Sequence, residues 1–230
     1  MKVLLICDDF HHPGDIPIRG IEPLKEKGFE FDVLQDPRGF DFNTLKDYPV
    51  VILSKSDYVA FQLDIPWKSD DDVQTAFIDY VENGGGLLVS HSGTVAGKHK
   101  PTKRLDALVG CRFTRHPNQC PVTVAPIKPH PITKGVDMFC EIDEHYFIDI
   151  LDPDVNVFAA AYAPPQGEES KYETEWYFNN PGGIVTAGYT RTQGKGRVCV
   201  LPPGHTVEVW LNGEFQKMLA NGLMWCAGEL

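Results

Sequence analysis

Histidines and carboxylates follow several apolar segments of this 230-residue chain, where buried strands are expected to end. Ligands of open α/β sheets bind at the carboxyl ends of the strands, so we expect these side chains to meet at one rim of a sheet. The polar groups are Asp8, Asp9, His11 and His12 after the first segment, Ser90 to Gly93 after the fourth, Asp143 to Tyr146 in the second half, and His205 after the last segment. The recurrence of such groups after several apolar segments is stronger evidence for a functional site than any single motif among them.

Residues 85–93 combine an apolar strand with the turn Ser-His-Ser-Gly. A small-X-small-Gly turn after a strand is typical of elbows that present a catalytic side chain above a sheet. Here the apex is His91, whose imidazole can act as a base, a hydrogen-bond donor or a metal ligand. The alternative is a histidine that only caps the strand. Ser92 is a candidate nucleophile of a serine hydrolase, although the sequence positions no base beside it.

Two further segments supply groups for such a site. If residues 141–150 form one strand, alternation places Asp143 and His145 on one face of it. Glu144 and Tyr146 then lie on the other face, and only one of the two pairs can point at the rim. His205 follows a stiff Pro-Pro-Gly turn that would hold it in place, and its alternative role is a loop residue bonded to the backbone.

His91, Glu144 and His205 share the His/His/carboxylate composition of zinc and iron sites that keep open coordination positions. We therefore expect these three residues to be catalytic, and also to be the ligands of a divalent metal if one is bound. Zinc is the favoured metal, because it suits two imidazoles beside a carboxylate.

The elements that must position these groups follow from the apolar pattern. Continuous apolar runs at residues 2–7, 29–34, 50–54 and 86–90 predict strands buried on both faces of a parallel sheet. Residues 73–83 have the spacing of an amphipathic helix, with Ser69 as its N-cap followed by three aspartates. The helix expected within 16–27 is short or interrupted, because it contains Pro17 and Pro23. Strands alternating with helices predict an open α/β sheet.

The second half predicts strands at 122–125, 141–150, 155–162, 184–189 and 197–201, an exposed loop at 163–172, and a closing helix at 214–227. The last strand and helix need the sheet that the first half begins. We therefore expect one domain, 1–230.

Composition excludes several classes of partner. The chain has 21 Lys and Arg against 32 Asp and Glu, a formal net charge of −11, and a hydrophobic fraction of 42%. Clustered basic residues are needed to bind nucleic acid or an anionic membrane, so neither partner is expected. The chain shows neither an export signal nor a membrane-spanning apolar run, and its six cysteines form no CxxC pair, which favours the cytoplasm. The oligomeric state stays open, a homo-oligomer included.

Several motifs recur together in an order typical of one family. They lie at residues 87–93, 130–135, 143–146, 194–198 with 203–205, and 221–228. In this order they resemble the ThuA-like (trehalose utilisation) family of the class I glutamine amidotransferase-like superfamily, over nearly the whole chain. The resemblance implies a flavodoxin-like three-layer α/β sandwich with a mostly parallel central sheet.

The resemblance also implies a sugar or sugar-derived substrate. The positions that match the family pattern are His91, Glu144, Tyr146 and His205. Class I amidotransferases carry a cysteine at the elbow, and an imidazole cannot replace a thiolate in acyl transfer from glutamine. The chain is therefore not expected to be a glutaminase.

Together these observations predict a cytoplasmic enzyme of carbohydrate metabolism. His91 and His205 would be ligands or general acid/base groups, and Glu144 a ligand or base. His12, Ser92 and Tyr146 are expected to bind the sugar-like substrate, with Tyr146 orienting it by a hydrogen bond. The alternative is a non-catalytic module that has lost its nucleophile and binds a small metabolite or a partner protein.

Overall fold

A computed structural model describes residues 1–60, 63–95, 102–165 and 182–230. Within these residues the chain forms a nine-stranded sheet in the order β2-β1-β3-β4-β11-β10-β9-β6-β7. Its parallel part consists of β2 (Glu30–Leu34), β1 (Lys2–Ile6), β3 (Val50–Leu53), β4 (Gly86–Ser90) and β11 (Gly196–Leu201). Antiparallel pairs then add β10 (Gly183–Gln193), β9 (Asn156–Ala163), β6 (Cys120–Pro126) and β7 (Phe139–Asp143). The sheet is therefore mixed, with its parallel part at the β2 side.

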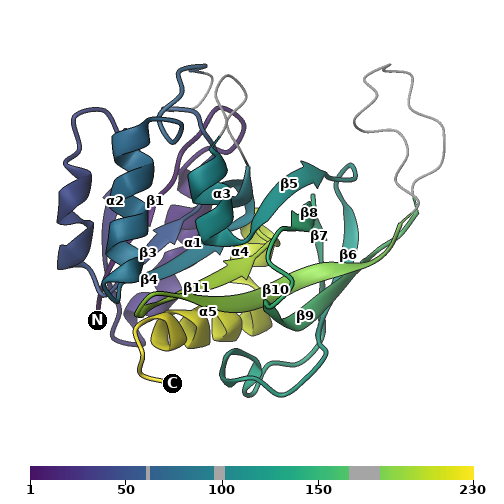
Figure 1. The fold of residues 1–230 in the computed structure, drawn as a ribbon. Helices are drawn as coiled ribbons and strands as arrows, with labels where there is room; N and C mark the ends of the chain where they lie inside the picture. The colour runs from purple at the N-terminus through teal and green to yellow at the C-terminus, as the bar shows by residue number, and fades with distance from the viewer. Residues whose placement is uncertain (61–62, 96–101, 166–181) are drawn as a thin grey trace.

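Helices cover both faces of the parallel strands (Figure 1). One face carries α1 (Asp15–Lys25), α4 (Val207–Leu211) and α5 (Gly213–Cys226), and the other carries α2 (Asp71–Glu82) and α3 (Lys103–Val109). Alternate residues of β1 explain this arrangement, because Val3 and Leu5 join the core under α5 whereas Leu4 and Ile6 join the core under α2. Short 3-10 helices span Phe42–Asp47, His91–Thr94 and Pro131–Thr133.

The four predicted strands of the first half are confirmed, although β2 lies at the edge of the sheet and is not buried on both faces. Two details of the helices also differ. Asp70, not Ser69, is the N-cap of α2, and its carboxylate accepts from the backbone N–H groups of the first turn. Helix α1 is continuous despite its prolines. Pro17 lies in the first turn, where a missing N–H needs no partner, and Pro23 removes one hydrogen bond from an otherwise well-packed helix.

The prediction of one strand over 141–150 is wrong. The chain leaves β7 after Asp143, and β8 (Phe147–Ile150) pairs with β5 (Cys111–Arg115) in a separate two-stranded sheet. At the break, the buried Asp143 carboxylate accepts hydrogen bonds from the N–H groups of Glu144, Gly204 and His205. The loop expected at 163–172 lies mostly outside the described residues. In the described part of the chain, no helix is long and apolar enough to cross a membrane.

Candidate functional site

The elbow after β4 holds His91 in a strained position. Its φ is +43°, in the left-handed region that side chains other than glycine rarely adopt, and its side chain is 1% exposed. A Cβ at Gly93 would collide with the Leu53 carbonyl oxygen, so this turn lies directly against the end of β3. The buried Lys68 ammonium donates to the carbonyl oxygens of Gly93 and Val95, at 3.1 and 2.8 Å. Packing and hydrogen bonds together fix the elbow.

A single buried carboxylate positions the second and third segments. Asp143 accepts hydrogen bonds from the backbone N–H groups of Gly204 and His205, at 3.1 and 2.9 Å, and from that of Glu144 at 3.0 Å. Burial raises the pKa of Asp143 to about 7, although these three hydrogen bonds oppose the shift. Gly204 has a φ of +133°, which only glycine adopts easily. The sharp turn and the carboxylate hold His205 and Glu144 side by side.

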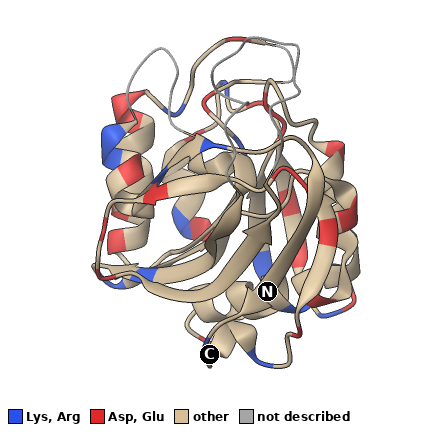
Figure 2. Ribbon diagram, turned by 90° about the vertical axis from the view of Figure 1, so that its right-hand side faces the viewer, with Lys and Arg blue, Asp and Glu red and all other residues tan. Residues whose placement is uncertain are grey.

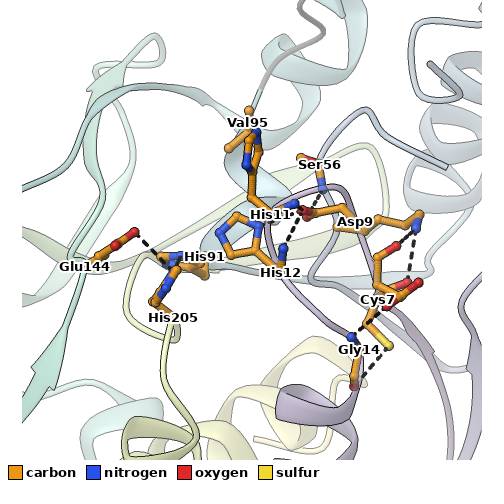
Figure 3. A network of polar contacts seen from close by, with 12 residues as sticks. Cys7, Asp9, His11, His12, Gly14, Ser56, His91, Val95, Glu144 and His205 are labelled. Carbon is orange, nitrogen blue, oxygen red and sulfur yellow. Dashed lines mark hydrogen bonds and ion pairs between the residues drawn. The ribbon is translucent and has the colours of Figure 1, made fainter. Parts of the chain in front are cut away.

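Three imidazoles converge at this rim (Figure 3). His12, His91 and His205 each offer one ring nitrogen, and these nitrogens all lie within 4.8 Å of one another. The Nδ1 of His91 lies 3.1 Å from the Pro202 carbonyl oxygen, and its Nε2 lies 3.3 Å from Nδ1 of His205. Zinc in tetrahedral coordination places its ligand nitrogens about 3.3 Å apart. We call these three residues the histidine trio.

The protonation of His91 and His205 suits metal binding. Burial, followed by the nearby His12 and His205, lowers the pKa of His91 well below its ordinary value. Burial, followed by His12 and His116, lowers the pKa of His205 to about 4, and Asp9 opposes this only in part. Both rings are therefore neutral at pH 7, and a neutral imidazole is the form that binds a metal.

Glu144 lies beside the histidine trio and outside it. Its Oε2 is 3.3 Å from Nδ1 of His205 and 3.5 Å from Nδ1 of His116. Burial raises the pKa of Glu144, while His12 and a hydrogen bond from Gln119 lower it. A carboxylate beside two imidazoles is placed to take part in proton transfer.

Tyr146 and Ser92 complete the surroundings of His91. The Tyr146 ring centroid lies 3.7 Å from that of His91, and its hydroxyl is 2.9 Å from Nε2 of His12. Tyr146 is buried, at 3% exposed. The Ser92 hydroxyl is buried and has no hydrogen-bond partner among the described residues. His145 points away, toward the Thr186 carbonyl oxygen.

The structure thus brings together most of the residues singled out from the sequence. His91 and His205 lie in the histidine trio, with Glu144 and Tyr146 in contact with it. The third imidazole is that of His12, which was expected to bind substrate and which takes the place in the trio expected for Glu144. His116 was not among the predicted site residues, because it follows β5, whose mixed pattern of buried and exposed residues does not look like a strand.

Comparisons with known proteins agree with this fold. A family model described as "ThuA: Trehalose utilisation" matches residues 2–226. A putative ThuA-like protein from Bacteroides uniformis is 20% identical, with a TM-score of 0.68 over 98% of this chain and 91% of that one. Another from Parabacteroides merdae is 18% identical, with a TM-score of 0.70 over 99% and 90%. A β-galactosidase from Bacillus circulans is 11% identical, with a TM-score of 0.64 over 99% of this chain and 31% of that one. A search among curated proteins gave no match.

Proposed function

The chain belongs to the ThuA (trehalose utilisation) family, and from this premise we propose that it is an enzyme of carbohydrate metabolism that acts on a sugar-like substrate with the help of a divalent metal. The observation that carries the proposal is the histidine trio, in which three ring nitrogens from three separate loops lie within 4.8 Å of one another. Three histidine nitrogens gathered around one point match the donor set of catalytic zinc sites. Zinc is the metal that best fits three nitrogen donors with an open fourth position.

When bound, such a metal polarises a carbonyl or hydroxyl oxygen of the substrate. The chain's own residues then supply the proton chemistry. Glu144 has the raised pKa of a general base and lies partly exposed at the rim, with 20% of its side chain accessible. Tyr146 presents its hydroxyl toward the same space as His12 and would orient a sugar hydroxyl by a hydrogen bond. Nδ1 of His116 lies 3.5 Å from Oε2 of Glu144 and 2.9 Å from the Pro117 carbonyl oxygen, so this ring holds the carboxylate in place as a donor.

The charge of the molecule supports an uncharged ligand. Lys and Arg are scattered among the more numerous Asp and Glu in the view of Figure 2. Glu144 and Asp9 add acidic groups at the site itself. A phosphorylated substrate would be repelled there, whereas a neutral sugar would not.

Two further points belong to the proposal. The parallel strands follow the order 2-1-3-4 and then β11, which is the flavodoxin-like order, and β11 from the end of the chain lies within the sheet that β1 begins. Both features support a flavodoxin-like fold in one domain, 1–230.

We also propose that the protein acts in the cytoplasm; a structural relative from Salmonella typhimurium LT2 is described as a cytoplasmic protein.

The test combines metal analysis with turnover. Protein purified without a histidine tag is loaded with Zn²⁺, dialysed, and offered a panel of keto-sugars and disaccharides. We expect turnover that is lost on chelation and in the His91→Ala variant. Metal-free protein that still turns over a sugar would contradict the metal, whereas sugar binding without any reaction would favour the non-catalytic module. Labelling of Ser92 by a fluorophosphonate probe would instead indicate a serine hydrolase.

A further inference from the structure

Asp9 is a fully buried carboxylate directly behind the histidine trio (Figure 3). Its Oδ1 accepts hydrogen bonds from the backbone N–H groups of His11 and His12, at 3.0 and 3.1 Å, and lies 2.7 Å from Nδ1 of the His12 ring. Its Oδ2 accepts from the Ser56 N–H at 2.8 Å. This one side chain therefore joins the loop after β1 to the loop after β3 and contacts an imidazole of the site.

These contacts determine which nitrogen of His12 carries a proton. Both carboxylate oxygens of Asp9 accept hydrogen bonds from backbone N–H groups, which is the geometry of an ionised carboxylate. An ionised carboxylate only accepts hydrogen bonds. The short contact with Asp9 therefore requires a proton on Nδ1 of His12, and in the neutral ring Nε2 carries the lone pair.

The lone pair on Nε2 faces the site. The Tyr146 hydroxyl lies 2.9 Å from this nitrogen, so the hydroxyl donates and the imidazole accepts. The hydrogen bonds run in one direction, from Tyr146 to His12 and from His12 to Asp9. In the same way, the contact of Nδ1 of His91 with the Pro202 carbonyl leaves Nε2 of His91 as the acceptor. Two rings of the trio thus present Nε2 lone pairs inward.

We propose that Asp9 is a positioning residue that fixes the tautomer and the orientation of His12, so that Nε2 of His12 is available to the site. In the metal-free protein the partner of Nε2 is the Tyr146 hydroxyl. If the proposed function holds, the same lone pair binds the divalent metal, and the Tyr146 hydroxyl is then released toward the substrate. Carboxylates that accept from the second nitrogen of a metal-binding imidazole raise the basicity of the ligand and fix its ring.

The first experiment needs no metal. The tautomer of His12 is read from long-range ¹H–¹⁵N correlation spectra of ¹⁵N-labelled, metal-free protein at pH 8, where an ordinary imidazole is neutral. We expect the proton on Nδ1 in the native protein and a shift of the population toward Nε2–H in Asp9→Ala. If Asp9→Ala does not fold, Asp9→Asn keeps the shape of the side chain, and the Nδ1 proton resonance should move upfield as the hydrogen bond loses its ionic acceptor.

The second experiment measures Zn²⁺ affinity by competition with a chelator. We expect a loss of about 10- to 100-fold in the Asp9 variants. Asp8→Asn is the matched control, because Asp8 precedes Asp9, bonds to the Gly14 N–H at 2.8 Å and tolerates asparagine at its φ of +73°. This control should leave both the tautomer and the affinity unchanged.

The two experiments separate the proposals. Native protein that binds no Zn²⁺ contradicts the metal-assisted function, while the spectra still decide the role of Asp9. A native His12 protonated on Nε2 overturns the positioning role. So does an Asp9 variant, folded by its amide spectrum, in which the His12 resonances are those of the native protein.

Discussion

His145 gives a prediction whose size follows from the structure. It lies between Glu144 and Tyr146 and points the opposite way, into the protein, where its Nε2 donates to the Thr186 carbonyl at 3.0 Å. It is fully buried, and its Nδ1 has no hydrogen-bond partner among the described residues. Burial lowers the pKa of His145 to about 4, and the hydrogen bond to Thr186 opposes this only in part. His145 is therefore a buried neutral anchor, and its protonation costs stability.

The sign of the pH effect follows from these values. The ordinary pKa of His145 is 6.5 and its folded value is about 4, so below pH 6.5 the unfolded chain binds a proton that the folded chain does not. The stability due to neutral His145 is complete above pH 6.5 and is lost as the pH falls toward 4. At pH 5.0 the loss amounts to about 2 kcal/mol.

The experiment compares the native chain with His145→Gln. The glutamine amide can donate to Thr186 and does not titrate, so the variant lacks this pH dependence. We expect the difference in free energy of unfolding between the two proteins, measured in urea, to shrink by about 2 kcal/mol between pH 7.5 and pH 5.0. Titration of other groups is common to both proteins and cancels. A difference that is the same at both pH values would refute the assignment of His145 as a buried neutral anchor.

Two further predictions concern the elbow and the proton-transfer group. Gly93→Ala should lower the free energy of unfolding by about 2 kcal/mol, because the added Cβ meets the Leu53 carbonyl oxygen. The control Gly213→Ala should change it little, because a Cβ there meets nothing within 4 Å. Equal stabilities of the two variants in urea would show that the elbow is not packed against β3. Glu144→Gln should abolish turnover yet keep the Zn²⁺ affinity within about tenfold of the native value. His91→Ala should lower the Zn²⁺ affinity, measured by chelator competition, by more than about 100-fold. A loss of more than about tenfold in Glu144→Gln would make Glu144 a ligand instead of a base.

The parallel strands were predictable because their apolar runs are continuous. β1, β3 and β4 are buried almost throughout, and burial on both faces leaves an unbroken signal in the sequence. The break after Asp143 was not predictable from local pattern. It depends on a carboxylate that accepts N–H groups of Gly204 and His205, about sixty positions away in the chain.

In the site, too, some features could be predicted from the sequence and others could not. His91 stood out because the small residues around it mark an elbow, and His205 because a rigid turn precedes it. The role of His12 could not be read from its position in the loop, because its ring direction is set by Asp9, which is itself held by Ser56 on another loop. Sequence spacing shows which residues reach the rim, while cross-loop hydrogen bonds decide which atoms face one another.

The most direct measurement of the central claim is zinc X-ray absorption on tag-free protein loaded with one equivalent of Zn²⁺. The structure predicts three imidazole nitrogens at about 2.0 Å with one further light ligand, and the loss of this signature in His91→Ala. A zinc ion surrounded by water and carboxylate oxygens, or the same imidazole signature in His91→Ala, would contradict a metal centre at His12, His91 and His205.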